Sequence, residues 1–487
     1  MQKLKTFLKS NIAIALGLFL FALGYYFMCA CKEYTWVFMS GDSADWLASA
    51  KIWFLPQPYG APIFIMLAKA INLLGGNLAK NMVFYLACLP SAVSVVLVYF
   101  ATLKVKGSKI IAIICSLVVI GAFPFLAEST VIREHSLAVM FVAAAMLAWT
   151  YRKYPLIILF MGLATAVNII PLYLTAIWAF ADLRGHWRDW LKWCWIFLIV
   201  GVAPYGLTLY LMGHAPYMWF QTNLSLASIN SYLSTTGTVA SLSMADFPSR
   251  ILDFVAVILV SYGIALIPAV RGFKPQWKVG FFAVAVFWVY LLDNDATTWT
   301  FTMYAVPAMA LLIAAGLKYK KEIIAVGICA LILISTNAIF LNAQTINDKN
   351  PMGRELYNST MALPDGSIVI TNQGGFVTLN MFYAISQGKD IQLDFATPII
   401  SYISSGASAQ YVSDIPGYMQ PAYKDWLKWA NSQGLEGDNS VDIARHAIED
   451  GVSVFRVNTY LVERDEDAYT LRPYNEYFDE VVAVNED

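Results

Sequence analysis

Two carboxylates stand close together near the start of the chain, in the stretch SGDSAD at residues 40–45. Asp42 and Asp45 are three positions apart, so on a helix they would share a face. Neighbouring carboxylates compete for ionisation, and a carboxylate poised in this way can take the proton of a hydroxyl group. Both residues are therefore candidate catalytic groups, although either could instead serve only as the N-cap of the following helix.

A stiff turn follows in QPYGAP at residues 57–62. Proline fixes the backbone and glycine lets it approach a bound group closely. We expect Gln57 and Tyr59 in this turn to bind substrate, and we assign Lys51, just before it, to a phosphate group. The alternative is a plain connector between two interfacial helices.

A second charged segment is ESTVIREH at residues 128–135. The guanidinium of Arg133 is permanently charged and its fork suits a phosphate. Glu134 beside it would orient it or bind a sugar hydroxyl, so Glu134 and His135 join Arg133 as donor-binding candidates and Glu128 as a substrate-binding one. The alternative is a local Arg–Glu ion pair that closes a helix, with a structural histidine.

A third acidic pair, Asp293 and Asp295, lies in a short polar turn between two apolar runs. We expect both to bind substrate, although a solvated turn has the same composition. The six cysteines and four histidines show neither zinc spacing nor a disulfide framework, so no metal site is expected.

The elements that must position these residues are membrane helices. The chain is 59% hydrophobic and 13% charged, whereas soluble domains carry roughly 25% charged residues. The 15 Trp and 27 Tyr residues suit interfacial belts. The net charge of -1 gives no sign of a nucleic-acid partner. The chain is therefore expected to be an integral, multi-pass membrane protein.

Apolar runs lie near residues 11–31, 82–103, 110–127, 136–150, 155–181, 191–212, 250–269, 278–292, 299–317 and 322–343. The positive-inside rule places the basic clusters in the cytoplasm, namely Lys104/Lys106/Lys109, Arg152/Lys153, Arg184/Arg188/Lys192, Arg271/Lys274/Lys278 and Lys318/Lys320/Lys321. Segment 155–181 must then cross twice, with its turn near Asn168 and Pro171, and segment 61–74 becomes an interfacial helix. The result is about eleven transmembrane helices.

Most acidic residues before residue 344 fall on the outer side in this orientation, including all the candidate acids. Ionisable groups gathered at one membrane face predict one outward-facing site. A transporter or flippase of a lipid-linked or sugar substrate is the main alternative, and it would hold such groups near mid-membrane.

Beyond residue 344 the apolar runs shorten and acidic residues outnumber basic ones. Strands are predicted at SIVITN (367–372), at DIQLDFA (390–396) and at residues 452–460, and helices near 376–387, 422–433 and 440–450. We expect residues 344–487 to form a soluble α/β domain outside the membrane. Its lack of cysteines favours a prokaryotic plasma membrane. A non-catalytic assembly protein, with this domain as its working part, is a further alternative.

Together these segments resemble the GT-C glycosyltransferases, specifically the protein O-mannosyltransferase-like branch. That branch has a D-S-G-E motif and then H-P-P-G-Y-P-L in its first external loop, which DSAD (42–45) and QPYGAPI (57–63) match loosely. Glu134 falls where the family has an acid in its second external loop. LLDNDATTWTFTMYAVPAMALLIAAGL (291–317) and LPDGSIVITNQGGFVTLNMFYAI (363–385) resemble later family segments. The chain departs from the pattern at Ala44-Asp45, Gln57 and Tyr59.

The resemblance implies a GT-C fold with a catalytic module at 1–343, a first external loop at 32–81 and the outer domain at 344–487. It implies transfer of mannose or another hexose from a polyprenyl-phosphate donor to a hydroxyl, expected to be protein Ser/Thr, on the outer face with inversion. Asp42 would activate the acceptor. A lipid monophosphate needs less charge neutralisation than a nucleotide diphosphate, so a divalent metal is compatible with the reaction but not required.

Overall fold

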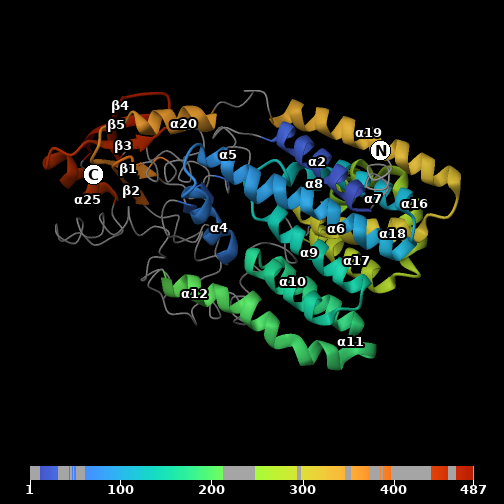
Figure 1. Cartoon of the computed structure of the whole chain (residues 1–487). Coiled ribbons are helices and arrows are strands. Elements are labelled where there is room, and N and C mark those ends of the chain that lie inside the picture. Colours follow the sequence, from blue (N-terminus) through green and yellow to red (C-terminus); the bar gives the residue numbers. More distant parts are fainter. Residues whose placement is uncertain are drawn as a thin grey trace.

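A computed structural model describes residues 11–30, 43, 46–47, 49–50, 61–211, 247–292, 298–345, 352–371, 384, 388–395, 440–458 and 468–485. Figure 1 shows a bundle of helices with a small sheet at one end. The helices up to residue 211 are α2 (Asn11–Cys29), α4 (Pro62–Asn72), α5 (Leu78–Met82), η2 (Val83–Cys88), α6 (Leu89–Lys106), α7 (Lys109–Gly121), α8 (Phe123–Glu128), α9 (His135–Thr150), α10 (Tyr154–Val167), α11 (Ile170–Phe197), η3 (Leu198–Val202) and α12 (Ala203–Leu211). The later helices are α15 (Phe247–Tyr262), η4 (Gly263–Ala265), α16 (Leu266–Phe273), α17 (Trp277–Leu292), η5 (Thr298–Ala305), α18 (Val306–Gly316), α19 (Lys320–Thr345), α20 (Met352–Met361) and α25 (Ser440–Glu449).

The helices of the bundle are those of an integral membrane protein. Five described helices are long and apolar enough to cross a membrane, and seven further apolar helices are shorter. Many large apolar side chains on them face outward, for example Phe180, Tyr210 and Trp288, as expected where lipid replaces water. The total of about eleven spans, and the interfacial place of α4, stay predictions.

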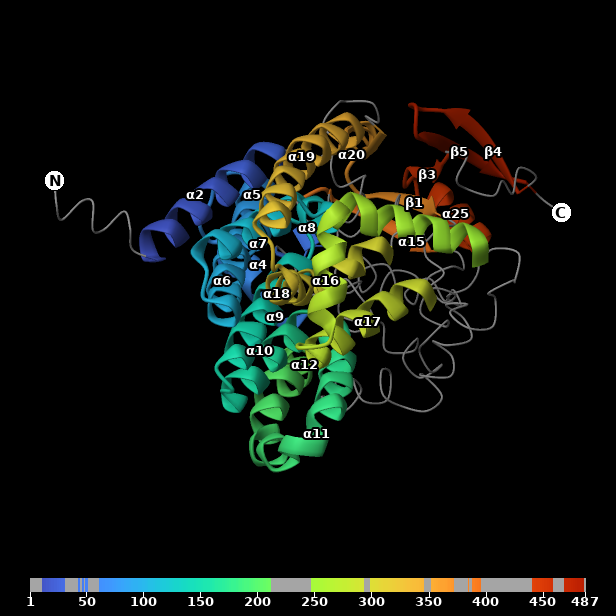
Figure 2. The ribbon, with the colours of Figure 1, turned by 90° about the vertical axis from the view of Figure 1, so that its right-hand side faces the viewer.

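The chain doubles back where the sequence predicts a turn. Helix α10 ends at Val167, Asn168 is extended, and α11 begins at Ile170 with a proline in its first turn. This confirms the break expected in segment 155–181. Inside α11 the backbone of His186 is not helical (φ -138°, ψ 25°), so two helices meet there at a kink. Figure 2 shows α10, α11 and α12 together at the lower end of the bundle.

A buried carboxylate holds this kinked region to its neighbours. Asp182 is fully buried, and its Oδ2 accepts hydrogen bonds from the Tyr154 hydroxyl at 2.9 Å and Trp190 Nε1 at 3.0 Å. Its Oδ1 lies 3.1 Å from His186 Nδ1 and forms an ion pair with Lys278 Nζ. Because the donors come from the start of α10, both arms of α11 and the start of α17, one side chain ties three helices together.

Two helices approach so closely that their backbones touch. A Cβ on Gly272 of α16 would lie 1.9 Å from the carbonyl oxygen of Leu312, and one on Gly316 of α18 would lie 1.8 Å from that of Pro268. Since no side chain fits at either position, only glycine permits this contact.

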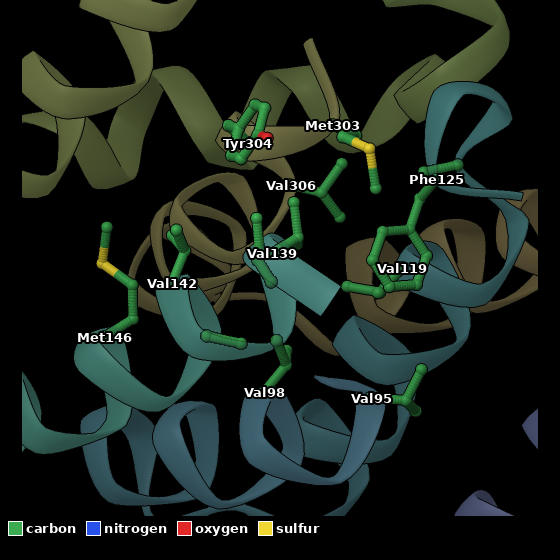
Figure 3. Close-up of a cluster of buried hydrophobic side chains, with 14 of the residues drawn as sticks. Val95, Val98, Val119, Phe125, Val139, Val142, Met146, Met303, Tyr304 and Val306 are labelled. Carbon is green, nitrogen blue, oxygen red and sulfur yellow. The ribbon is translucent and has the colours of Figure 1, made fainter. Parts of the chain in front are cut away.

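The core between the helices is apolar. Figure 3 shows side chains from α6, α7, α8 and α9 meeting Met303, Tyr304 and Val306 of η5 and α18. Val98, Val139 and Val142 lie in this cluster, at most 2% exposed. The apolar cluster packs against η5, so Tyr304 lies fully buried against the core.

A five-stranded sheet follows the last long helix, in the order β2-β1-β3-β5-β4. The strands are β1 (Ser367–Thr371), β2 (Ile391–Phe395), β3 (Val454–Val457), β4 (Tyr469–Pro473) and β5 (Phe478–Val484). Strands β1, β2 and β3 pair in parallel, with Ile368 opposite Gln392 and Val454, whereas β5 runs antiparallel to β3 and β4. Helix α25 packs on this sheet.

The first three strands and α25 lie where the sequence predicts them, whereas the β4–β5 hairpin and α20 were not predicted. The helices expected near 376–387 and 422–433 lie outside the described residues, apart from residue 384. The division of the chain at residue 344 stays a prediction.

Candidate active site

The candidate site is a buried polar cluster around the turn that joins α8 to α9. Helix α8 is short: Pro124 stands in its first turn and the helix ends at Glu128. Residues 129–134 form the turn, in which the Arg133 N–H bonds the Val131 carbonyl at 3.1 Å. Helix α9 then begins at His135. The turn thereby brings Glu128, Arg133, Glu134 and His135 to one end of two helices.

Arg133 and Glu128 form an ion pair within this turn. Arg133 Nη1 donates to Glu128 Oε1 at 3.2 Å, and the two side chains are 14% and 3% exposed. Glu128 is also anchored through its backbone, because the Ser136 hydroxyl donates to its carbonyl oxygen at 2.9 Å. This is the local Arg–Glu pair that the sequence left open as an alternative.

Glu134 points to the break between α10 and α11. Its Oε1 accepts a hydrogen bond from Asn168 Nδ2 at 2.8 Å, and both residues are 6% exposed. The same oxygen lies 3.8 Å from His135 Nε2. The carboxylate is thus held by an uncharged amide, beside an imidazole.

His135 connects the cluster to η5. Its Nδ1 and the Tyr304 hydroxyl share a hydrogen bond of 3.0 Å, and both side chains are buried. The rings of Phe301 and Tyr304 meet the imidazole edge to face, with centroids 5.6 and 5.9 Å away. This contact joins η5, which begins at Thr298, to the cluster.

Ser43, from the segment between α2 and α4, also reaches the cluster. The Ser43 hydroxyl donates to the carbonyl oxygen of Ile132 at 3.1 Å, and Ser43 is fully buried. Trp46 is fully buried too and meets the ring of Phe64 with centroids 4.8 Å apart. The neighbour of Asp42 in the chain is therefore bonded to the turn that carries Arg133.

The structure thus brings together four of the predicted site residues, Glu128, Arg133, Glu134 and His135. The other predicted site residues lie outside the described part of the chain, namely Asp42, Asp45, Lys51, Gln57, Tyr59, Asp293 and Asp295.

Two members of the cluster were not assigned to a site from the sequence. Asn168 was identified only as a turn residue, although an asparagine between two apolar helices needs polar partners. Tyr304 lies within an apolar run, and nothing in its spacing predicts that it meets His135.

The cluster combines a cation, hydrogen-bonding groups and aromatic rings, which are groups able to bind phosphate and hydroxyl groups. Arg133 supplies a fixed positive charge, Glu134 a hydrogen-bond acceptor for hydroxyl groups, and His135 with Tyr304 a second polar pair beside an aromatic wall. Among the described residues, no three His, Cys, Asp or Glu side chains gather in a way that could hold a metal ion.

The arrangement of the helices is similar to that of solved structures with the GT-C fold. ArnT from Cupriavidus metallidurans in the apo state is similar with a TM-score of 0.58 and 12% identity over 98% of each chain. The same protein bound to undecaprenyl phosphate gives a TM-score of 0.55 and 11% identity over 97% of each chain.

A second solved relative in fold is the Archaeoglobus fulgidus oligosaccharyltransferase in complex with Zn and sulfate. It gives a TM-score of 0.50 and 14% identity over 90% of this chain and 68% of that chain. At these identities the likeness concerns the fold. No protein-family model and no curated protein sequence matches the chain.

Proposed function

We propose that the protein is a glycosyltransferase that uses a polyprenyl-phosphate-linked sugar. It transfers a hexose such as mannose to a hydroxyl acceptor, which we take to be protein Ser/Thr as in the O-mannosyltransferase-like branch. The reaction takes place on the outer face of the membrane and inverts the anomeric carbon. The ArnT of similar fold binds undecaprenyl phosphate, which supports a lipid carrier of this kind.

The observation that carries the proposal is the hydrogen bond from Ser43 to Ile132. It fixes a residue adjacent to Asp42 against the turn that carries Arg133 and Glu134. Two segments about 90 positions apart in sequence therefore meet at one place. A glycosyl transfer needs this combination, since the base and the groups that hold the donor must face the same anomeric carbon.

The proposed reaction is a single displacement. Asp42 takes the proton of the acceptor hydroxyl, and the hydroxyl oxygen forms a bond to the anomeric carbon. The bond from that carbon to the phosphate oxygen breaks, and its electron pair leaves with the lipid phosphate. Arg133 balances the charge of the leaving phosphate, with Lys51 as a further cation and His135 beside the donor.

The remaining predicted residues take part in binding. Asp45 supports Asp42, and Gln57 and Tyr59 line the acceptor side. Asp293 and Asp295 bind sugar or acceptor hydroxyls, as does Glu128 where its carboxylate is not taken up by Arg133. We place residues 344–487 outside the membrane as a separate domain. We expect the membrane itself to be a prokaryotic plasma membrane.

The test is a transfer assay on the purified full-length protein in detergent. It uses radiolabelled mannosyl- and glucosyl-phosphoryl polyprenols and a Ser/Thr-rich peptide pool, and compares wild type with Asp42→Asn. Asp189→Asn is the matched control, because it removes a carboxylate from α11 that has no part in the proposed site. We expect label on the peptide with wild type and the control, and a loss of at least 1000-fold with Asp42→Asn.

Other outcomes would change the proposal. Label released to water by wild type alone would keep the donor and reject the peptide acceptor. Retained turnover in Asp42→Asn would reject the assigned base. No consumption of either lipid-linked sugar would favour the transporter or assembly-protein alternatives.

A further inference from the structure

Asn168 occupies the break between α10 and α11. Its N–H donates to the Ala164 carbonyl at 2.9 Å, which is the last hydrogen bond of α10, and its φ and ψ are -151° and 143°. Pro171 in the first turn of α11 lacks an N–H, and in a continuous helix its ring would clash with the Val167 carbonyl four residues earlier. The break is thus fixed by local sequence, and the side chain of Asn168 is left 6% exposed.

Both ends of the Asn168 amide are used. Its Oδ1 accepts the backbone N–H of Ile170 at 2.9 Å, while its Nδ2 donates to Glu134 Oε1 at 2.8 Å. A backbone N–H can only donate, so it must face the oxygen of the amide. The NH₂ group then faces Glu134, so the two hydrogen-bond partners determine the orientation of the amide.

Glu134 and His135 are held by different partners although they are adjacent. Asn168 holds the carboxylate of Glu134, while Tyr304 of η5 holds the imidazole of His135. Tyr205 of α12 and Tyr304 are also close enough to Glu134 to interact electrostatically. The carboxylate therefore lies among polar groups from α9, α12, η5 and the α10–α11 break, in addition to Arg133 and Glu128 in its own turn.

We propose that Asn168 is a positioning residue that fixes Glu134 to bind the hydroxyl groups of the donor sugar. An amide orients a carboxylate without neutralising it, whereas an arginine or lysine at this place would take its charge. The carboxylate thereby keeps strong acceptor capacity for sugar hydroxyls. This inference rests on the proposed function, in which Glu134 contacts the donor, and it adds the residue that sets the geometry of that contact.

Substitutions at Asn168 can separate this role from a purely structural one. Asn168→Ser and Asn168→Asp both keep an oxygen for the Ile170 N–H, because Ser and Asp cap helices well. Both lose the amide N–H that donates to Glu134 in the wild type. In Asn168→Asp two carboxylates face each other and compete for ionisation, so one holds a proton to higher pH.

The experiment measures donor-dependent turnover from pH 5 to 9, together with the melting temperature, for wild type and both variants. We expect melting temperatures close to wild type and a fall in kcat/KM for the donor of about 10- to 100-fold. In Asn168→Asp alone, the acid limb of the pH profile should move up by about one unit or more. Glu134→Gln/Asn168→Asp restores a hydrogen bond with reversed polarity, and should also melt close to wild type while the activity stays low.

Each contrary result has a distinct meaning. If wild type turns over the donor but Asn168→Asp and Asn168→Ser match its kinetics and pH profile, this inference is wrong and the proposed function stands. Recovery of activity in the double variant would show that only the shape of the pair matters, which also rejects it. If wild type has no turnover with any lipid-linked sugar, the proposed function fails and this inference fails with it.

Discussion

Replacing Asp182 by asparagine should cost the folded protein about 3 kcal/mol. The substitution keeps the shape of the side chain and one acceptor oxygen, but removes the charge that Lys278 pairs with. Asp182 is fully buried, and the Tyr154 and Trp190 donors point at its Oδ2. The retained oxygen can still accept from these two donors, so the loss falls mainly on the ion pair with Lys278 and the contact with His186.

The magnitude follows from the burial of the two partners. Removing one member of a buried ion pair costs about 3–5 kcal/mol, because the other charge is left uncompensated. The side chain of Lys278 is 23% exposed, so its ammonium can turn partly to water. This places the cost near the lower end of the range. At about 2 °C for each kcal/mol, the melting temperature should fall by about 6 °C.

The assay is thermal unfolding of the full-length protein in detergent, for wild type, Asp182→Asn, Lys278→Met and the double variant. Asp189→Asn, seven positions further along α11 and only partly buried, is the control and should change the melting temperature by less than 2 °C. The double variant should regain more than half of the loss, because no unpaired charge remains. An unchanged melting temperature for Asp182→Asn, or additive effects in the double variant, would refute the reasoning.

Three further predictions concern the cluster, the helix contact and the metal. Arg133→Lys keeps the positive charge but loses the planar fork, so the KM for the donor should rise about tenfold with a smaller change in kcat; an unchanged KM in steady-state kinetics would remove Arg133 from the donor site. Gly272→Ala places a Cβ 1.9 Å from a carbonyl oxygen and should lower the free energy of unfolding by about 3 kcal/mol or more, measured by thermal unfolding. Gly185→Ala is the control and should not lower it, because there is open space around Gly185. Equal effects of the two substitutions would contradict the contact. Treatment with EDTA should leave turnover unchanged, since one phosphate monoester needs little charge neutralisation; a loss that Mg²⁺ or Mn²⁺ restores would show metal assistance.

The sequence predicts the helices well where apolar runs are continuous. α2, α9 and α19 lie almost where the runs at 11–31, 136–150 and 322–343 place them. The break before α11 was predictable too, because the positive-inside rule requires segment 155–181 to cross twice and Asn168 and Pro171 give it a place to turn. These features depend on local composition, which a sequence displays directly.

Features that depend on tertiary packing were not predictable in the same way. The π-helical segments η2 and η3 lie in apolar runs that read as ordinary helix. No local pattern predicts the buried pairing of Asp182, because its partners Trp190 and Lys278 come close only after α11 bends and α17 packs beside it. The β4–β5 hairpin gave a weak signal, since charged residues interrupt its alternation, although Asn475 accepts the N–H groups of Tyr477 and Phe478 as a turn residue.

The candidate site shows the same division. The segment 128–135 could be predicted as a candidate site, because its charged residues lie at the end of an apolar run. Its internal pairing was not evident, since Arg133 and Glu128 are five positions apart and meet across a turn rather than along a helix. The contact of His135 with Tyr304 joins residues 169 positions apart, and no local pattern encodes it.

The contact between Gly272 and Gly316 has a mechanical consequence. Because the backbones of α16 and α18 touch, neither helix can slide or rotate past the other without collision, and the two must move as one rigid body. A polyprenyl chain that enters the bundle sideways cannot pass between them. Its path has to open where helices are separated by side chains, which can change rotamer and make room.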